Sequence, residues 1–383
     1  MRFSVDAHAI GQQLTGNEVY VRSLLDGFAK LDSDAEFVAY ISEPDVNGWV
    51  PSRFLKRHVT ARRYWRLGFQ LADRLRRDRP ELIHVQYNAP LFCPVPTVVT
   101  VHDVSFVEHP EYFPPGQAWQ LRMIAGQTAR RAARIVTISE FSRRRIARAF
   151  GIEEEEIVVT PLAAQEHLRP ANRAQAAHHV RQRFGLDRPF LLTVGDLQPR
   201  KNQLGLIRAF RELLAGEPQL PHALVLAGKE TWFAPRVREE IRRSGLAERI
   251  VVTGFVGEED LAALYNAADL FVFPSFYEGF GLPVIEAMAC GCAVVCSNAA
   301  SLPEVADAAA ILVDPQDTAE ITRAMRDVLL DHELRERLKR HGLQRAGAFS
   351  WRETARRTLE VYYAVAEGRR RTVAAAECAR ATR

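Results

Sequence analysis

The chain has 383 residues, more than one hydrophobic core usually organises, so two domains are expected. It is 47% hydrophobic and 26% charged, which is ordinary for a globular protein and excludes disordered, collagen-like and disulfide-rich classes. The formal net charge of +4 is too small to require nucleic acid as a partner.

The first half of the chain alternates short apolar runs with helical patterns, which is typical of βα units around a parallel sheet. A first helix is predicted from Thr15, because Thr15-x-x-Glu18 forms a capping-box pattern ahead of apolar residues at helical spacing. A loop from Asp6 to about Thr15 would join this helix to the first strand. Strands are expected at 1–5, 37–41, 82–85, 97–101, 135–138 and 157–159.

The second half repeats the alternation after a polar passage around 163–187, which we interpret as the crossing between domains. Strands are expected at 190–194, 223–227, 250–253, 270–273, 293–296 and 310–312, with helices between them. The pattern therefore predicts two Rossmann-like, doubly wound α/β domains at 1–170 and 171–350. A final helix at about 351–366 would pack back on the first domain, and 367–383 would form a disordered tail.

Basic residues are concentrated in the stretch 51–80, which contains ten Lys or Arg and only two Asp and so has a local net charge of +8. Three of these cations lie among large apolar residues, so a helix here would present both kinds of group. They are Arg62, Arg63 and Arg66, beside Tyr64, Trp65, Leu67, Phe69 and Leu71. Two interpretations stay open. The helix lies on an anionic membrane surface, or it covers the first sheet with its arginines solvated.

The cysteines are five, an odd number, and unevenly spaced, which favours a reducing compartment over a disulfide framework. The amino terminus becomes polar at Asp6, too soon for a signal peptide, and no apolar run approaches the ~18 residues of a membrane span. We therefore expect a cytoplasmic protein, peripheral at the inner leaflet of the membrane if the basic helix binds lipid.

One segment joins a buried strand to a helix through a loop with two glycines, Gly279 and Gly281, followed by Pro283 in the first helical turn. Backbone amides and the helix dipole favour an anion such as a diphosphate at this helix start. A diphosphate would repel Glu278 and Glu286, so ribose and sugar hydroxyls are their natural partners. Taken alone, the two glutamates would be acids that a helix N-terminus favours.

A second strand end places Gly195 before the adjacent cations Arg200 and Lys201. Arginine as a planar fork and lysine as a mobile charge would clamp a diphosphate. Taken alone, the pair would be a solvated basic turn. Its position favours a site, because ligands of open α/β sheets bind outside the carboxyl ends of the strands.

Together these residues resemble the signature of glycosyltransferase family 4, the retaining enzymes with the GT-B fold. The resemblance rests on Glu278-Gly-Phe-Gly-Leu-Pro-x-x-Glu286-Ala-Met-Ala-x-Gly291 and on Val194-Gly195-x-x-x-x-Arg200-Lys201-Asn202, and it covers nearly the whole chain. The chain departs from the pattern at Asp196, where many relatives carry arginine. Residues 199–202 are most similar to bacterial mannosyltransferases of surface-polysaccharide synthesis.

The resemblance implies a GT-B architecture, two Rossmann-like domains facing each other across a cleft. It also implies that Glu286 holds the ribose and that Glu278 lies near the transferred sugar. Arg200 and Lys201 would neutralise the diphosphate, and His102 would contact the sugar. The other implied donor contacts are Gly195, Phe255, Gly279, Phe280, Gly281 and Leu282, while Gly11 and Gly16 would border the phosphates and the acceptor.

The implied reaction is retaining transfer of a hexose from a nucleotide-diphosphate-sugar to a saccharide or lipid-linked saccharide, with GDP-mannose favoured over UDP-hexoses. Two alternatives remain: a nucleotide-sugar 2-epimerase of similar fold, which needs no acceptor, and a non-catalytic nucleotide-sugar-binding protein. A nicotinamide dehydrogenase is disfavoured, because no strand is followed by a full GxGxxG with an acid about 20 residues further on.

No metal or other cofactor is expected. Asp32-Ser33-Asp34 matches the metal-binding Asp-x-Asp of GT-A transferases, but it falls between the first helix and the second strand, away from the site. Cys290, Cys292 and Cys296 lack a fourth ligand at zinc-like spacing, so we predict buried thiols. The pair at 178–179, two histidines in a polar helix, is predicted to be solvated.

Overall fold

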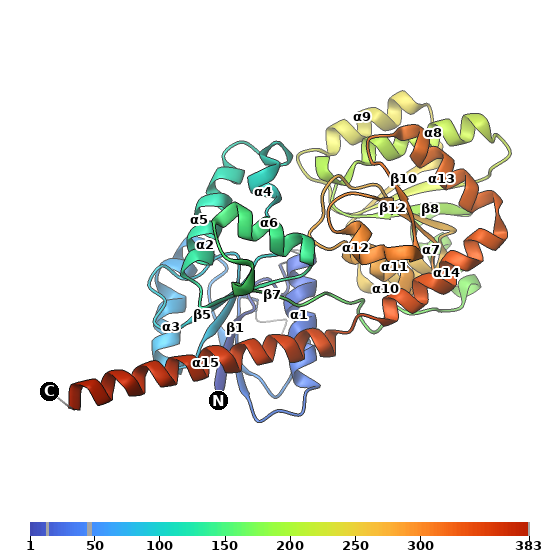
Figure 1. Cartoon of the computed structure of the whole chain (residues 1–383). Coiled ribbons are helices and arrows are strands. Elements are labelled where there is room, and N and C mark those ends of the chain that lie inside the picture. Colours follow the sequence, from blue (N-terminus) through green and yellow to red (C-terminus); the bar gives the residue numbers. More distant parts are fainter. Residues whose placement is uncertain (13–14, 44–47, 382–383) are drawn as a thin grey trace. The chain divides into compact units, whose positions relative to one another are not determined.

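The computed structural model describes residues 1–12, 15–43 and 48–381, with the backbone alone at 15 and 371–381. The chain forms two compact units (Figure 1). Unit 1 comprises Met1–Glu108, Pro115–Leu162 and Ser350–Arg383, and unit 2 comprises His109–Pro114 and Ala163–Phe349. The polypeptide thus passes from unit 1 to unit 2 at 162–163, somewhat before the boundary expected at 170, and returns at 350.

Unit 1 is built on a seven-stranded sheet whose neighbouring strands all pair in parallel. The strands are β1 (Arg2–Asp6), β2 (Glu36–Ile41), β3 (Leu55–His58), β4 (Ile83–Gln86), β5 (Thr97–Thr100), β6 (Arg134–Thr137) and β7 (Ile157–Val159). Their spatial order is β3-β2-β1-β4-β5-β6-β7. The strand β3 was not predicted from the sequence, because this edge strand is half exposed and mostly charged, as edge strands often are.

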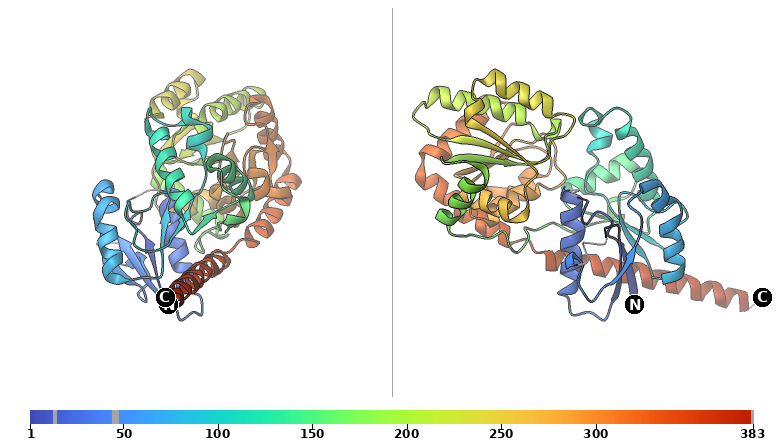
Figure 2. Two further views of the ribbon diagram at one scale, coloured as in Figure 1. Left: turned by 60° about the vertical axis from the view of Figure 1, so that its left-hand side comes forward. Right: turned by 180° about the vertical axis from the view of Figure 1, so that it is seen from behind.

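Helices cover both faces of this sheet (Figure 2). They are α1 (Thr15–Ala29), α2 (Arg63–Trp65), the π-helical turn η2 (Arg66–Gln70), α3 (Leu71–Asp78), α4 (Ser105–Glu108), α5 (Gln117–Arg131), α6 (Glu140–Phe150) and α15 (Trp351–Ala381). Glu18 accepts a hydrogen bond from the Gly11 amide at 2.9 Å, and the predicted capping box involves the Thr15 side chain, which lies outside the part of the chain that the structure describes. Glu18 therefore fixes the loop between β1 and α1.

The helix α15 follows the return of the chain to unit 1 and packs within that unit. Tyr362 lies against Phe3, with ring centroids 5.3 Å apart, and its hydroxyl is 2.5 Å from Nδ1 of His84 on β4. The helix extends to Ala381, where a disordered tail was expected from 367, and its last residues are rich in alanine, the best helix former. None of the described helices combines the length and apolarity needed to cross a bilayer.

Unit 2 holds a six-stranded parallel sheet, ordered β10-β9-β8-β11-β12-β13. Its strands are β8 (Phe190–Val194), β9 (Ala223–Ala227), β10 (Ile250–Gly254), β11 (Leu270–Phe273), β12 (Val294–Ser297) and β13 (Ile311–Val313). All six follow the predicted apolar runs. The chain order reverses between β8 and β11, and in such sheets this is the point where ligands bind.

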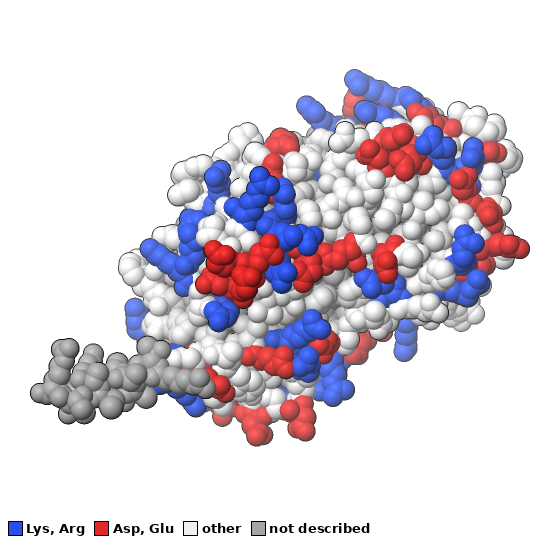
Figure 3. All heavy atoms as spheres, viewed as in Figure 1, with Lys and Arg blue, Asp and Glu red and all other residues white. Residues whose placement is uncertain are grey.

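The helices of unit 2 lie on both faces of its sheet (Figure 2). They are α7 (Arg173–Phe184), α8 (Gln203–Gly216), α9 (Ala234–Ser244), α10 (Glu258–Ala267), α11 (Leu282–Ala289), α12 (Leu302–Ala306), α13 (Thr318–Leu330) and α14 (His332–Gly347). Leu206, Phe210 and Met325 are fully buried in the core that these helices form with the strands. Acidic and basic side chains are interspersed on the face shown in Figure 3, as the small net charge leads one to expect.

Candidate active site

The first part of the site is the turn that follows β8. Gly195 has φ of 151°, and a Cβ at this position would lie 3.0 Å from Cε of Lys201. Lys201 ends a 3₁₀ turn, Pro199–Lys201, and its side chain folds back over Gly195. Glycine is needed here, because a side chain would displace Lys201.

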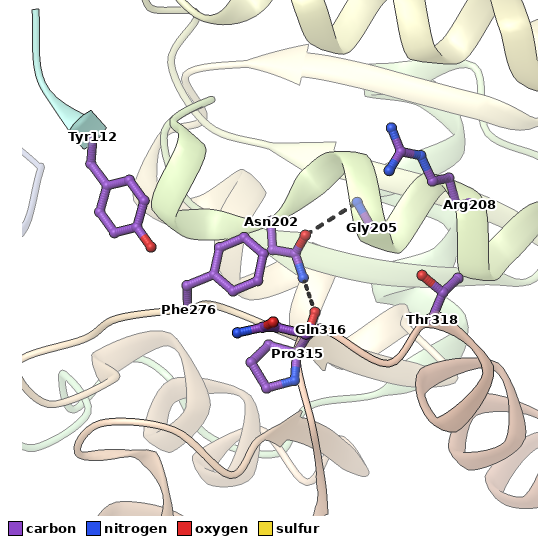
Figure 4. Close-up of a pocket in the computed structure, with 8 residues that line it drawn as sticks. All are labelled: Tyr112, Asn202, Gly205, Arg208, Phe276, Pro315, Gln316 and Thr318. Carbon is purple, nitrogen blue, oxygen red and sulfur yellow. Dashed lines mark hydrogen bonds between the residues drawn. The ribbon is translucent and has the colours of Figure 1, made fainter. Parts of the chain in front are cut away.

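Asn202 follows this turn and caps α8. Its φ is 54°, its Oδ1 accepts a hydrogen bond from the Gly205 amide at 3.2 Å, and its Nδ2 donates to the Pro315 carbonyl at 2.7 Å. Asn202 also lines a cavity of about 370 Å³ in unit 2 (Figure 4). The cavity is lined by Tyr112, Asn202, Gly205, Arg208, Phe276, Pro315, Gln316 and Thr318. The bond to Pro315 holds the turn that carries Arg200 and Lys201 against the loop after β13, and the bond from Gly205 caps α8.

Arg200, Lys201 and Glu278 form one ionic cluster. Nη1 of Arg200 lies 2.7 Å from Oε2 of Glu278, and Nζ of Lys201 lies 2.7 Å from Oε1 of the same carboxylate. Lys201 is 9% exposed and Glu278 is 6% exposed. Burial alone would raise the pKa of Glu278, but Arg200 and Lys201 outweigh it and hold that pKa below its usual value. Burial and the neighbouring Arg200 lower the pKa of Lys201.

The sequence places both cations and Glu278 at strand ends, and the structure adds the direct contact between them. That contact arises because β8 and β11 are neighbours, so the turn after β8 meets the loop after β11. A single buried carboxylate thus holds two cations in a fixed position. Asp196 lies beside this cluster and accepts a hydrogen bond from the Lys229 amide at 3.4 Å.

The second part of the site is the start of α11. Gly281 is its N-cap residue, with φ of 97°, and Leu302 packs where a Cβ of Gly281 would lie. Glycine is therefore required both by the backbone conformation and by the close approach. It brings no side-chain oxygen to the first amides of the helix, and such amides attract an anion. Gly279 and Phe280 are buried in the preceding loop, and Leu282 begins the helix.

Glu286 lies inside α11 and is 5% exposed. The Tyr265 hydroxyl donates a hydrogen bond to its Oε2 at 2.9 Å. Burial raises the pKa of Glu286 to about 7, against the opposing effect of that hydrogen bond. The two glutamates of the motif therefore have opposite electrostatic environments: Glu278 is held ionised by cations, and Glu286 is easily protonated.

Phe255 and Lys229 add a mixed surface at the same edge of the sheet. Phe255 follows β10 and is half exposed, and Nζ of Lys229, which follows β9, lies 5.5 Å from its ring centroid. Phe255 was predicted as a donor contact from the sequence, whereas its contact with Lys229 was not. The position of Lys229 directly after a strand, next to Gly228, was the available signal.

In unit 1, His102 follows β5 and is buried. Its Nε2 lies 2.8 Å from Oε1 of Gln86, and its ring meets the Tyr20 ring edge-on at a centroid distance of 4.7 Å. Burial lowers the pKa of His102 to about 4, so the imidazole is neutral near pH 7. Gln86 accepts the hydrogen bond and was not identified from the sequence.

Gly11 and Gly16 lie after β1, at the same sheet edge of unit 1 as His102. Gly11 has φ of 83°, which suits glycine, and its amide is bound by Glu18. Gly16 lies in the first turn of α1, and a Cβ there would meet no atom within 4 Å. The local packing therefore requires glycine at the first position and leaves open space at the second.

Arg66 is not available on the surface, contrary to the prediction that it contributes to a basic helical face. It is 3% exposed, and its guanidinium pairs with Asp6 at the end of β1. His8 Nδ1 lies 3.1 Å from the same carboxylate. Burial would raise the pKa of Asp6, but His8 and Arg66 together lower it. The contact joins residues 60 positions apart, and nothing in the local sequence indicated it.

The remaining predictions have mixed outcomes. Cys290, Cys292 and Cys296 are buried free thiols, as predicted. Asp32 and Asp34 lie in the connection that leads to the amino end of β2, opposite the edge where ligands bind. Among the described residues, no group of three or more His, Cys, Asp or Glu is arranged to hold a metal ion.

The histidine pair is partly mispredicted. His178 is exposed, but Nε2 of His179 lies 2.8 Å from Oδ1 of Asp260, so His179 is a half-buried partner of α10.

Two parallel α/β units, one of which presents paired cations beside a glycine-rich helix start, define the class of the protein as a glycosyltransferase with the GT-B fold. Solved structures support the fold. Sucrose-phosphate synthase from Thermosynechococcus elongatus matches with a TM-score of 0.77 and 20% identity, covering 95% of this chain and 99% of that chain.

Sequence comparison gives the family. Residues 14–164 match the model for glycosyltransferase family 4, and residues 175–345 match that for glycosyl transferases group 1. The O-antigen chain mannosyltransferase B of Escherichia coli is 38% identical over 266 residues, 69% of each chain. The serotype-specific mannosyltransferase WbdA of Escherichia coli is 36% identical over 236 residues, which are 60% of this chain and 28% of WbdA. The chain belongs to glycosyltransferase family 4.

Proposed function

We propose that this enzyme is a retaining mannosyltransferase, which moves mannose from GDP-mannose to a saccharide or lipid-linked saccharide during the synthesis of a surface polysaccharide. The observation that carries the proposal is the cluster of Arg200, Lys201 and Glu278 beside the start of α11. The names of the most similar curated relatives support mannose as the sugar.

The cluster suits a diphosphate that acquires charge as it leaves. Arg200 and Lys201 are already in place and largely removed from water, so they need little rearrangement when the bond to the sugar breaks. The amides at the start of α11 add a second source of positive potential. Fixed charges of this kind stabilise the departing group, and the proposal needs no divalent cation.

Glu278 keeps the cluster neutral enough to remain buried before the donor arrives. When a diphosphate binds Arg200 and Lys201, it competes with the Glu278 carboxylate for the same cations. Glu278 then becomes available to accept hydrogen bonds from sugar hydroxyls. This exchange explains how one carboxylate can serve a site that attracts an anion.

Glu286 would hold the ribose through its two hydroxyls, since a carboxylate can accept both hydrogen bonds. Because its pKa is raised to about 7, the ionised form that binds the diol is the minor form below that pH. Tyr265 keeps one carboxylate oxygen oriented. Binding of the nucleotide should therefore depend on the protonation of this one residue.

The proposed reaction keeps the anomeric configuration. The acceptor hydroxyl attacks the anomeric carbon from the face that the diphosphate leaves, the bond to the diphosphate oxygen breaks, and the acceptor proton passes to a phosphate oxygen. No protein base is needed for this transfer. His102 is neutral and can form a hydrogen bond with a sugar hydroxyl without adding charge.

A donor screen tests the proposal. Purified protein is incubated with GDP-mannose or UDP-hexoses, with and without a saccharide acceptor, and released nucleoside diphosphate is measured. We expect release from GDP-mannose that depends on the acceptor, and NMR of the product should show the donor's anomeric configuration. Conversion without any acceptor would indicate the epimerase, binding without turnover would indicate a binding protein, and turnover of UDP-hexoses alone would contradict GDP-mannose.

The location that we propose is the cytoplasmic side of a membrane. The free thiols Cys93, Cys290, Cys292 and Cys296 are in keeping with a reducing compartment. A growing saccharide attached to a lipid would be presented to the enzyme at the membrane surface.

A further inference from the structure

Unit 1 carries an exposed apolar surface that the proposed reaction does not use. Six large side chains, which we call the aromatic rim, are each between 61% and 76% exposed. They are Tyr64, Trp65, Phe69, Leu91, Phe92 and Trp119. Scattered apolar residues are normal on a protein surface, but a contiguous group of this size marks an interaction site.

The rim comes from three segments of the chain that are tied to one another. The rings of Trp65 and Phe69 are 5.6 Å apart. The Leu91 amide donates to the Leu67 carbonyl at 3.1 Å, which ties the loop after β4 to η2. The Gln120 side chain donates to the Tyr64 hydroxyl at 3.0 Å, which ties the start of α5 to α2. Figure 1 shows α2 and α5 on the same side of unit 1.

A buried ion pair beneath the rim helps to keep its side chains in solvent. Arg66 lies between the exposed Trp65 and Phe69 in sequence, and its guanidinium is buried against Asp6. The turn η2 is π-helical, with the Leu71 amide bonded to the Arg66 carbonyl five residues back. Such turns are rare and frequently occur at functional sites. The buried arginine and the wide turn together leave the two neighbouring aromatic rings in solvent.

The charged residues beside the rim are mainly basic. Arg62 and Arg122 are exposed there. Residues 61–72, 87–102 and 115–139 contain no Asp or Glu, and Asp73, which follows the first of these ranges, is paired with Arg77 at 3.0 Å. Exposed aromatic side chains with arginines beside them are complementary to an anionic lipid surface, where apolar groups enter the interface and arginines meet the headgroups. A protein partner would not by itself require this excess of cations.

The rim also lies at the edge of the sheet where the acceptor is expected. Residues 63–70 follow β3 and residues 87–92 follow β4, so both emerge at the carboxyl ends of the strands. Gly11 and His102 follow β1 and β5 at the same edge. A surface that rests on lipid at this edge would bring His102 close to an acceptor anchored in that lipid.

We infer that the aromatic rim docks unit 1 onto an anionic membrane and thereby presents the enzyme to a lipid-linked acceptor. The inference rests on the proposed transferase activity for its purpose, and the docking itself can be measured without turnover. It replaces the basic helical face predicted from sequence, because Arg66 points inward and the aromatic side chains supply the contact.

Vesicle flotation of the full-length protein tests the inference. Vesicles of phosphatidylcholine alone are compared with vesicles that also contain about 30% phosphatidylglycerol, roughly the anionic share of a typical membrane. We expect the wild type to float with the anionic vesicles, and this binding should weaken as salt is added. The double variant Trp65→Ser, Trp119→Ser should lose about tenfold or more in its partition constant, since both indoles are removed from the interface. The control is Leu330→Ser, which removes another exposed apolar side chain, on α13, and should float like the wild type.

Two further measurements separate the outcomes. Release of nucleoside diphosphate with a short, water-soluble saccharide acceptor should be the same in the double variant and the wild type, so loss of flotation would not reflect loss of the fold or of the transferase. Absence of flotation in an active wild type would overturn the docking and leave the proposed function intact. A dimer in sedimentation that the double variant abolishes, without vesicle binding, would overturn it in favour of a second copy of the chain.

Discussion

Lys201 is held on three sides, by Gly195 beneath its side chain, by the Phe273 ring 4.7 Å from its Nζ, and by Glu278. We predict that Lys201→Ala lowers kcat by about 100-fold or more, because a fixed charge that stabilises the departing diphosphate is lost. Steady-state kinetics with GDP-mannose measure this effect. The control is Lys339→Ala, whose ammonium pairs with Glu336 on α14. Unchanged kcat in a folded Lys201→Ala protein would refute the clamp.

The raised pKa of Glu286 predicts how the stability of the protein depends on pH. Its pKa is about 7 in the folded protein, against a usual value of 4.5, so between these pH values the folded state binds a proton that the unfolded state has released. The free energy of unfolding therefore falls as pH rises from 4.5 to 7, by about 3 kcal/mol in total. Glu286→Gln stays neutral, so we expect the variant to be more stable than the wild type at pH 8 by up to about 3 kcal/mol and similar to it at pH 4.

The same substitution should weaken nucleotide binding, because the amide cannot accept both ribose hydrogen bonds. Calorimetry with GDP should show affinity that rises through about pH 7 in the wild type and does not in Glu286→Gln. The change in stability predicted for the same variant is measured by urea unfolding at pH 4 and pH 8. Glu278→Gln is the contrast: it leaves the buried Lys201 and the partly buried Arg200 without a carboxylate and should destabilise the protein at pH 8. Equal GDP affinity in Glu286→Gln and the wild type would disprove the ribose contact.

At the scale of elements, the packing of α15 on α1 depends on Gly27. A Cβ at this position would lie 2.7 Å from Cβ of Ala355 and 2.8 Å from the Trp351 carbonyl oxygen. We predict that Gly27→Ala destabilises the protein by about 1–3 kcal/mol, because the two helices must move apart. Gly16→Ala, in the same helix but in open space, should be neutral or stabilising. Denaturant unfolding compares them, and equal stability of the two variants would contradict this account.

The strands also show which parts of the fold can be predicted from the sequence. The strands of unit 2 are apolar runs, such as Leu270–Phe273, and burial on both faces of a parallel sheet makes such runs easy to predict. The strand β3 is mostly charged and lies at an edge, so its sequence resembles a surface loop. The pattern of apolar residues in a sequence reflects burial, and none of the residues of β3 is buried.

The site was predictable at the level of residue types and strand ends, but its contacts were not. Arg200 and Glu278 lie 78 positions apart, and their contact follows from the adjacency of β8 and β11, which only the strand order reveals. The burial of Arg66 likewise follows from the placement of η2 over the end of β1. Side chains with long, flexible stems can point to solvent or to a distant carboxylate, and local sequence does not distinguish the two.

At the scale of the whole molecule, we predict that transfer persists in an excess of chelator. The expectation follows from the fixed cations of the cluster and the open start of α11, which supply positive charge where a divalent ion would act in other transferases. The measurement is nucleoside diphosphate release after dialysis against EDTA. Activity that disappears and returns with magnesium or manganese would contradict the prediction, and Asp32→Asn would then test the Asp-x-Asp segment.

The path of the chain through the two units has a consequence for biosynthesis. Unit 1 is completed by Ser350–Arg383, a segment that is synthesised only after unit 2. Phe3 and Phe28, which pack against Tyr362, must therefore wait for their partner while all of Ala163–Phe349 is translated, roughly 10–40 s at about 5–20 residues per second. During that interval the nascent first domain exposes an aromatic face to the cytosol, whereas the second is a nearly continuous stretch of chain that can fold as it emerges. Synthesis in chain order thus makes unit 1, most of which precedes unit 2 in the chain, the last of the two units to finish folding.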